Sequence, residues 1–210
     1  LIAYGIDTLS RRKYDIYFKE LSTGKILTDV LINTTGSAIW ANDNKTIFYS
    51  TKDPTTLRAN KIFKHVLGTK QFEDVLVYEE KDETFSTGVY KSKSEDYIMI
   101  FSSQTLSSEH RYLDANTPNG EWKVIQPREK NLTYDVSHFQ DYFYIRTNLN
   151  AKNFKIVKTP VTSTTKKNWI DIIPHRTDIL VSGIELFNDY LVINERVNGL
   201  SAIRIKAWNG

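Results

Sequence analysis

The chain has 210 residues, of which 40% are hydrophobic and 12% aromatic, so it can bury a sizeable core and is not a disordered chain. Its 28 basic and 25 acidic residues give a net charge of +3 without a long run of one sign, and we expect no nucleic-acid partner. The sequence has no cysteine, which excludes disulfides and thiolate metal sites, and no apolar run near the roughly 18 residues that cross a bilayer, so we expect no membrane partner.

Short β-like runs with polar turns between them follow one another along the whole chain. The chain starts in such a run, LIAYG. In chain order the further predicted strands are 14–25, 25–32 and 37–40; 42–51, 61–69, 74–80 and 86–90; 93–103, 110–117, 121–129 and 135–139; 139–148, 154–162, 168–176 and 181–187; and 187–196 and 201–210. We count about 18 strands, and no window shows sustained helical periodicity.

The strands recur in the same order with a period of about 45 to 50 residues, as the run starts at Ile47, Tyr97, Tyr142 and Tyr190 show. Four short antiparallel strands per period are typical of the blades of a β-propeller, in which each sheet buries its faces against its neighbours. The sequence thus predicts an all-β propeller with units of roughly 1–35, 36–83, 84–131, 132–178 and 179–210. The strand count is not a multiple of four, so we expect an arc of a larger ring.

Acidic residues stand at the head of the repeated runs, namely Asp43, Asp96, Asp141 and Asp189. We expect them in register, in the turn between the first and second strands of each unit, where a short carboxylate accepts hydrogen bonds from nearby backbone amides. Repetition at equivalent sites favours turn structure over a single catalytic centre.

Several stretches are more specific than a generic propeller: 10–25, 40–49, 65–69, 77–85, 152–154 and 187–205. Together they resemble the oligopeptidase B group of the prolyl oligopeptidase family of serine peptidases (S9), over essentially the whole chain. The resemblance covers only the N-terminal β-propeller region and implies about four and a half blades of a seven-bladed ring. It also implies a cytosolic endopeptidase that cleaves short peptides after Arg or Lys. In such an enzyme the propeller covers a C-terminal α/β-hydrolase domain and excludes folded proteins.

The catalytic part of that family is absent from this sequence. No G-x-S-x-G nucleophile elbow occurs, so we assign no catalytic, cofactor-binding or metal-binding residue and expect no cofactor. The parent protein would be a peptidase, whereas this chain lacks the Ser/Asp/His triad. The expected partners are the parent's own C-terminal hydrolase domain and peptide substrates, with self-association through exposed blade edges as a further possibility. The sequence favours the cytoplasm and leaves the periplasm open.

Two other functions remain open. One is a stand-alone propeller that acts as a protein-interaction scaffold. The other is a glycosidase, for which Asp135, Glu185 and Glu195 are the carboxylates that could lie near a propeller axis.

Single polar residues have a structural interpretation that we prefer to a catalytic one. The four histidines are spread one per unit, and we expect structural or surface roles for them: His65, His110, His138 and His175. Serines near strand starts are interpreted as turn or edge residues: Ser37, Ser86 and Ser182. The pair Glu195 and Arg196 is interpreted as a solvated strand end before an Asn-Gly turn, although a charged pair at a domain interface is an alternative.

The acidic run near residue 80 supports one electrostatic hypothesis. If Glu79, Glu80, Asp82 and Glu83 lie on the surface, their charge would raise the local concentration of basic substrates. The three N-x-T sequons, at Asn33, Asn44 and Asn131, are interpreted as chance matches. The tryptophans are assigned to packing between blades: Trp40, Trp122, Trp169 and Trp208.

Overall fold

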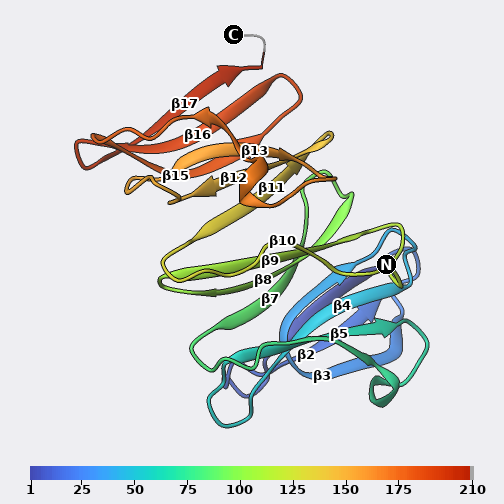
Figure 1. Cartoon of the computed structure of the whole chain (residues 1–210). Coiled ribbons are helices and arrows are strands. Elements are labelled where there is room, and N and C mark those ends of the chain that lie inside the picture. Colours follow the sequence, from blue (N-terminus) through green and yellow to red (C-terminus); the bar gives the residue numbers. More distant parts are fainter. Residues whose placement is uncertain (209–210) are drawn as a thin grey trace. The chain divides into compact units, whose positions relative to one another are not determined.

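The computed structural model describes residues 1–208 and shows a chain built from β-strands (Figure 1). Over this range the only other regular elements are two single-turn 3-10 helices, η1 (Gln71–Glu73) and η2 (Lys166–Asn168). The predicted all-β class is therefore confirmed. No helix among these residues is long and apolar enough to cross a membrane. The last two residues of the predicted strand 201–210, Asn209 and Gly210, lie outside the described range.

The strands form four antiparallel sheets, each of which follows the chain order without a crossover. The first sheet contains β1 (Ile2–Ile6), β2 (Tyr14–Lys19), β3 (Ile26–Trp40), β4 (Thr46–Lys52), β5 (Ala59–Val66) and β6 (Val75–Glu79). The second contains β7 (Ser86–Lys91), β8 (Tyr97–Gln104), β9 (Ser107–Asp114) and β10 (Lys123–Gln126). The third contains β11 (Tyr134–Phe139), β12 (Tyr142–Thr147), β13 (Lys155–Pro160) and β14 (Ile170–Ile173). The fourth contains β15 (Ile179–Leu186), β16 (Tyr190–Val197) and β17 (Leu200–Ala207).

The six-stranded sheet corrects one feature of the sequence prediction. The runs 25–32 and 37–40 were expected as separate strands, but they form one continuous strand, β3. Thr34 pairs with Tyr14 of β2 on one side and with Thr51 of β4 on the other. Gly36 allows this bend because it has a φ of +95°, and an added Cβ would lie 2.7 Å from the Tyr14 ring.

The chain forms two compact units, of which unit 1 comprises residues 1–91, 95–104 and 112–122, and unit 2 comprises 92–94, 105–111 and 123–210. In unit 1, apolar clusters lie around Phe48 and Ile98 and around Phe18 and Ile47. In unit 2, an apolar cluster lies around Ile156. Burial of each such side chain stabilises the fold by roughly 1.5 to 3 kcal/mol.

Two of the four tryptophans pack between sheets, as predicted, whereas Trp40 contacts Phe18 within its own sheet. In unit 1, the Trp122 ring meets Phe48 of β4 edge-on, with ring centroids 5.6 Å apart. In unit 2, the Trp208 ring stacks on Phe139 of β11 at 5.5 Å. Aromatic contacts of this kind stabilise the packing of neighbouring sheets beyond the area that they bury.

The expected register of the four acidic residues is wrong for Asp43. The main-chain oxygens of Asp96, Asp141 and Asp189 each accept a hydrogen bond from the backbone N–H that follows the next strand of the hairpin. In the first sheet the main-chain oxygen of Lys45 makes the equivalent bond. Asp43 lies two residues earlier, and its Oδ1 accepts from Lys45 N at 2.9 Å and from Thr46 N at 2.8 Å. Burial raises the pKa of Asp43, but these hydrogen bonds outweigh burial and lower it below its ordinary value. The predicted turn role of the carboxylate is thus confirmed for Asp43, although Asp43 is out of register with the other three.

Candidate functional site

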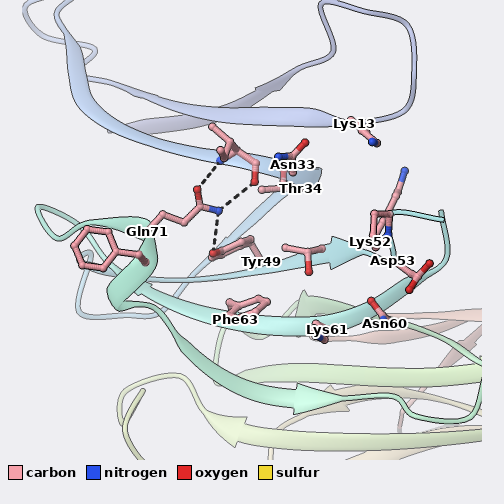
Figure 2. A pocket seen from close by; sticks show the side chains of 14 residues that line it. Lys13, Asn33, Thr34, Tyr49, Lys52, Asp53, Asn60, Lys61, Phe63 and Gln71 are labelled. Carbon is pink, nitrogen blue, oxygen red and sulfur yellow. Dashed lines mark hydrogen bonds between the residues drawn. The ribbon is translucent and has the colours of Figure 1, made fainter. Parts of the chain in front are cut away.

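A cavity of about 630 Å³ opens in unit 1 beside the bend of β3 (Figure 2). Strand β3 contributes Asn33 and Thr34 to its lining, and β4 contributes Tyr49 and Lys52. Strand β5, η1 and the loops before β2 and after β4 supply the remainder of the wall. This volume lies within the range of pockets that bind small molecules and cofactors. The local fold creates the cavity, because β3 leaves β2 and joins β4 at this point.

One side chain, Gln71, fixes the position of η1 against β3. Its Oε1 accepts from Ile32 N at 2.9 Å, and its Nε2 donates to Ile32 O at 3.1 Å, as a paired strand residue would (Figure 2). Its Nε2 also lies 3.4 Å from the Tyr49 hydroxyl. These bonds hold this wall of the cavity in place before any ligand arrives.

Behind the cavity wall lies a buried polar network. The Tyr49 hydroxyl donates to Asp74 Oδ2 at 2.7 Å, and His65 Nδ1 lies 2.7 Å from Asp74 Oδ1. Burial raises the pKa of Tyr49, and the bond to Asp74 raises it further, so the phenol stays protonated and donates. Asp29 lies 3.8 Å from the other ring nitrogen of His65 and accepts a hydrogen bond from Gly68 N. The network supports the wall of the cavity. Of its side chains only Tyr49 lines the cavity, and its protonated hydroxyl is not a nucleophile.

The opposite end of the cavity is cationic. Lys13, Lys52 and Lys61 line it together with a single carboxylate, Asp53. Hydrogen bonds from the backbone N–H groups of Thr56 and Thr55 lower the pKa of Asp53, so its carboxylate is ionised. These bonds hold the carboxylate in the turn that follows β4. The lining contains no histidine, serine or glutamate. The cavity is therefore suited to binding an anion rather than to acid–base or nucleophilic chemistry.

A further hollow, of about 380 Å³, lies in unit 2 where three turns between consecutive strands meet. There Ser94 Oγ lies 2.8 Å from His138 Nδ1. Lys93 Nζ lies 3.6 Å from the centre of the Phe187 ring and 3.4 Å from Glu185 Oε2. The sequence analysis did not bring these residues together, although the turns occupy equivalent places in the repeats. That equivalence is the signal that could have found them.

The candidate glycosidase carboxylates each have a different cationic partner. Asp135 lies 2.8 Å from Arg146, and Glu185 bonds Lys93. Glu195 is buried, and its Oε1 accepts from Arg176 and from Arg204. An acid and base pair needs two carboxylates that flank one substrate bond, and these ion pairs give no such arrangement.

Two interpretations of charged residues require correction. Glu195 was interpreted as part of a solvated strand end, but only Arg196 is exposed, and Glu195 is buried against two other arginines. Glu80 was placed in a surface acidic run, but it is also buried. Its carboxylate accepts hydrogen bonds from Tyr78 OH, Ser102 Oγ and Asp82 N. The surface part of the run therefore excludes Glu80.

The remaining histidines occupy different environments. His110 Nε2 lies 2.9 Å from Tyr134 O, and burial lowers the pKa of His110 to about 4. His175 is half-buried beyond β14. Among residues 1–208 no group of three or more His, Asp and Glu side chains could hold a metal ion.

The serines and sequons have simple structural positions. The three serines lie in strands and are exposed: Ser37 in β3, Ser86 in β7 and Ser182 in β15. A left-handed backbone conformation is shared by the three sequon asparagines, Asn33 (φ 57°), Asn44 (φ 55°) and Asn131 (φ 64°). Asparagine adopts this conformation more readily than most residues, which accounts for its presence at the bend of β3 and in the two turns.

Antiparallel sheets that follow one another along the chain, two of them four-stranded, define an all-β protein of the propeller class. The family described as "Prolyl oligopeptidase, N-terminal beta-propeller domain" matches residues 1–209. The chain belongs to this family, and the resemblance seen in the sequence is confirmed.

Similar proteins include larger peptidases. Dipeptidyl aminopeptidase BI of Pseudoxanthomonas mexicana is 43% identical over 211 residues, which cover 100% of this chain and 29% of that protein. Protease 2 of Moraxella lacunata is 33% identical over 193 residues, or 91% of this chain and 28% of that protein. The structure of oligopeptidase B from Leishmania major superposes with a TM-score of 0.92 at 32% identity, over 98% of this chain and 29% of that one. The chain thus spans less than a third of the length of these relatives.

Proposed function

We propose that this chain is the propeller part of a cytoplasmic serine endopeptidase of the oligopeptidase B type, which cleaves short peptides after Arg or Lys. The observation that carries the proposal is the match of the whole chain to the propeller family, together with relatives named as peptidases that are more than three times its length. Similarity to the oligopeptidase B structure from Leishmania major supports the peptidase type. On this proposal the chain supplies about four and a half blades of a seven-bladed ring.

The proposed role of the propeller is to select substrates by size. The chemistry would come from the partner that the resemblance implies, a C-terminal α/β-hydrolase domain of the same protein. This chain offers rigid sheets and binding cavities but no G-x-S-x-G elbow, which supports a covering rather than a catalytic role. Flexible peptides would reach the active site, whereas folded proteins would be excluded by their size.

A second candidate activity is the release of dipeptides from free N-termini. The dipeptidyl aminopeptidase BI is 43% identical to this chain, compared with 33% for protease 2 and 32% for oligopeptidase B. The two activities differ in whether the substrate must have a free amino terminus. A stand-alone interaction scaffold remains the alternative from another class.

The decisive experiment uses the complete protein encoded by the gene. We expect it to cleave an N-terminally blocked reporter after Arg or Lys, to cleave an unfolded peptide and to spare a folded protein that carries the same sequence. Faster release of dipeptides from unblocked reporters, with no activity on blocked ones, would favour the aminopeptidase. Absence of a hydrolase domain from the complete reading frame would favour the scaffold.

A further inference from the structure

The lysine-lined cavity of unit 1 has chemically different ends. Figure 2 shows Lys13, Lys52 and Asp53 gathered away from Gln71. Phe72 follows Gln71 in η1 and also lines the cavity, and 86% of its surface is exposed. A ligand that fills the cavity would meet positive charge at one end and an aromatic side chain at the other.

The cationic end has charge that internal pairs do not neutralise. Lys61 lies 3.6 Å from Glu79, but both side chains are more than a third exposed, so water screens this pair. Lys52 Nζ donates to the neutral main-chain oxygen of Arg12, which leaves its charge uncompensated. With three lysines and one carboxylate in the lining, this part of the cavity attracts anions.

The apolar part of the cavity is held ready for a side chain. The rings of Tyr49 and Phe63 stack at 5.7 Å, and the bonds of Gln71 to Ile32 keep η1 in place. Ile32 is itself exposed, as is Phe72. Exposed large apolar side chains around a concave, charged site are typical of recognition surfaces.

We propose that this cavity binds an acidic, apolar peptide segment of a partner polypeptide. The carboxylates of the segment would pair with Lys13, Lys52 and Lys61, and a leucine or phenylalanine side chain would pack against Phe63 and Phe72. Charge complementarity selects an acidic occupant, and the separate aromatic end selects a peptide over a simple anion. This site does not depend on the proposed peptidase activity, because it requires no cleavage.

The test measures direct binding to the 210-residue chain by fluorescence anisotropy. The probe is a fluorescein-labelled hexapeptide with three aspartates followed by leucine, phenylalanine and leucine. Two further probes have asparagine in place of aspartate, or serine in place of the apolar residues. We expect saturable binding of the first probe, with Kd higher by about tenfold or more for each of the others, since either end contributes at least one strong contact.

The variants isolate the site from the general charge of the protein. K13Q/K52Q/K61Q removes the cationic end, and the matched control K25Q/K70Q/K130Q removes three exposed lysines outside the lining. F72S removes an exposed ring, so it leaves the core unaltered. We expect a loss of about tenfold or more in affinity for the first triple variant and for F72S, and no change for the control. Circular dichroism confirms the fold of each variant.

Three results would overturn the proposal. The first is no saturable binding of the acidic, apolar peptide. The second is an equal loss of affinity in the cavity and control triple variants, which would indicate general electrostatic attraction. The third is equally tight binding of a single-stranded oligonucleotide of the same charge, whose bases can stack on Phe72, which would show that the site does not select a peptide.

Discussion

His65 and Asp74 are joined inside unit 1, with His65 Nδ1 2.7 Å from Asp74 Oδ1 and each side chain only 1% exposed. The second oxygen of Asp74 accepts from the Tyr49 hydroxyl at 2.7 Å. One carboxylate therefore connects β4, β5 and the segment that follows η1. Because these elements form the wall of the lysine-lined cavity, the network supports the shape of that site.

Removal of Asp74 should destabilise the chain more than removal of a single bond to it. In D74A two buried polar groups lose a partner, so we expect the free energy of unfolding to fall by about 3 kcal/mol. In Y49F the bond to Asp74 is lost together with the long 3.4 Å bond from Gln71, but Asp74 keeps His65 and Gln71 keeps Ile32 as partners, so we expect a fall of about 1 kcal/mol. Urea unfolding monitored by circular dichroism measures both. Equal effects of the two variants would show that Asp74 does not connect the network.

The three carboxylates considered for glycosidase chemistry should differ sharply in their effect on stability. Glu195 is buried between two arginines that remain partly exposed, so we expect E195A to lower the free energy of unfolding by about 2 kcal/mol. Asp135 and Glu185 are exposed, and we expect D135A and E185A to cost less than about 1 kcal/mol. Thermal unfolding distinguishes these cases. Similar costs for all three variants would contradict the assignment of Glu195 as a buried ion-pair residue.

The sequence could predict the repeated sheets because their signal is local. Alternating or continuous apolar runs such as 47–49 and 143–145 fill sheet interiors, and polar turns separate them. It could not predict that β3 runs through two predicted strands. That continuity depends on Gly36 and on pairing with both β2 and β4, which are contacts between distant residues.

The burial of single charged residues was also beyond the sequence. In the sequence, Glu80 and Glu195 cannot be distinguished from neighbouring charged residues that are exposed. In the structure each is buried against partners on other strands, such as Ser102 and Arg204. The sequence did not predict the lysine-lined cavity for the same reason, since Lys13 and Lys61 line one cavity only in the folded chain. Periodicity shows which face of a strand is buried, but it does not identify the partner of a polar side chain.

His110 predicts a specific dependence of stability on pH. Burial lowers its pKa to about 4 from an ordinary value of 6.5, so the folded state keeps the ring neutral while the unfolded state binds a proton below pH 6.5. Stability should therefore be complete above pH 6.5 and should fall as the pH falls toward 4. Between pH 6.5 and pH 5 we expect a loss of about 2 kcal/mol from this group.

Urea titrations at several pH values compare the native chain with H110Q, which cannot titrate. We expect H110Q to be less stable at pH 7.5, because the bond to Tyr134 O is altered, but to lose less stability on acidification. Identical pH profiles for the two chains would show that another group causes the acid sensitivity.

The outer edge of the last strand predicts self-association of the 210-residue chain. Strand β17 ends its sheet, side by side with β16 (Figure 1), and its side chains Leu200, Ile203 and Ile205 are 74%, 71% and 65% exposed. A free strand edge with exposed apolar residues favours pairing with a second copy. We expect dimers or larger species in sedimentation velocity experiments, at a proportion that rises with concentration. The double variant I203K/I205K should be monomeric, because like charges oppose edge pairing, whereas L9K/L21K, which alters equally exposed residues outside strands, should associate as the native chain does. A native chain that stays monomeric at high concentration would rule out edge pairing.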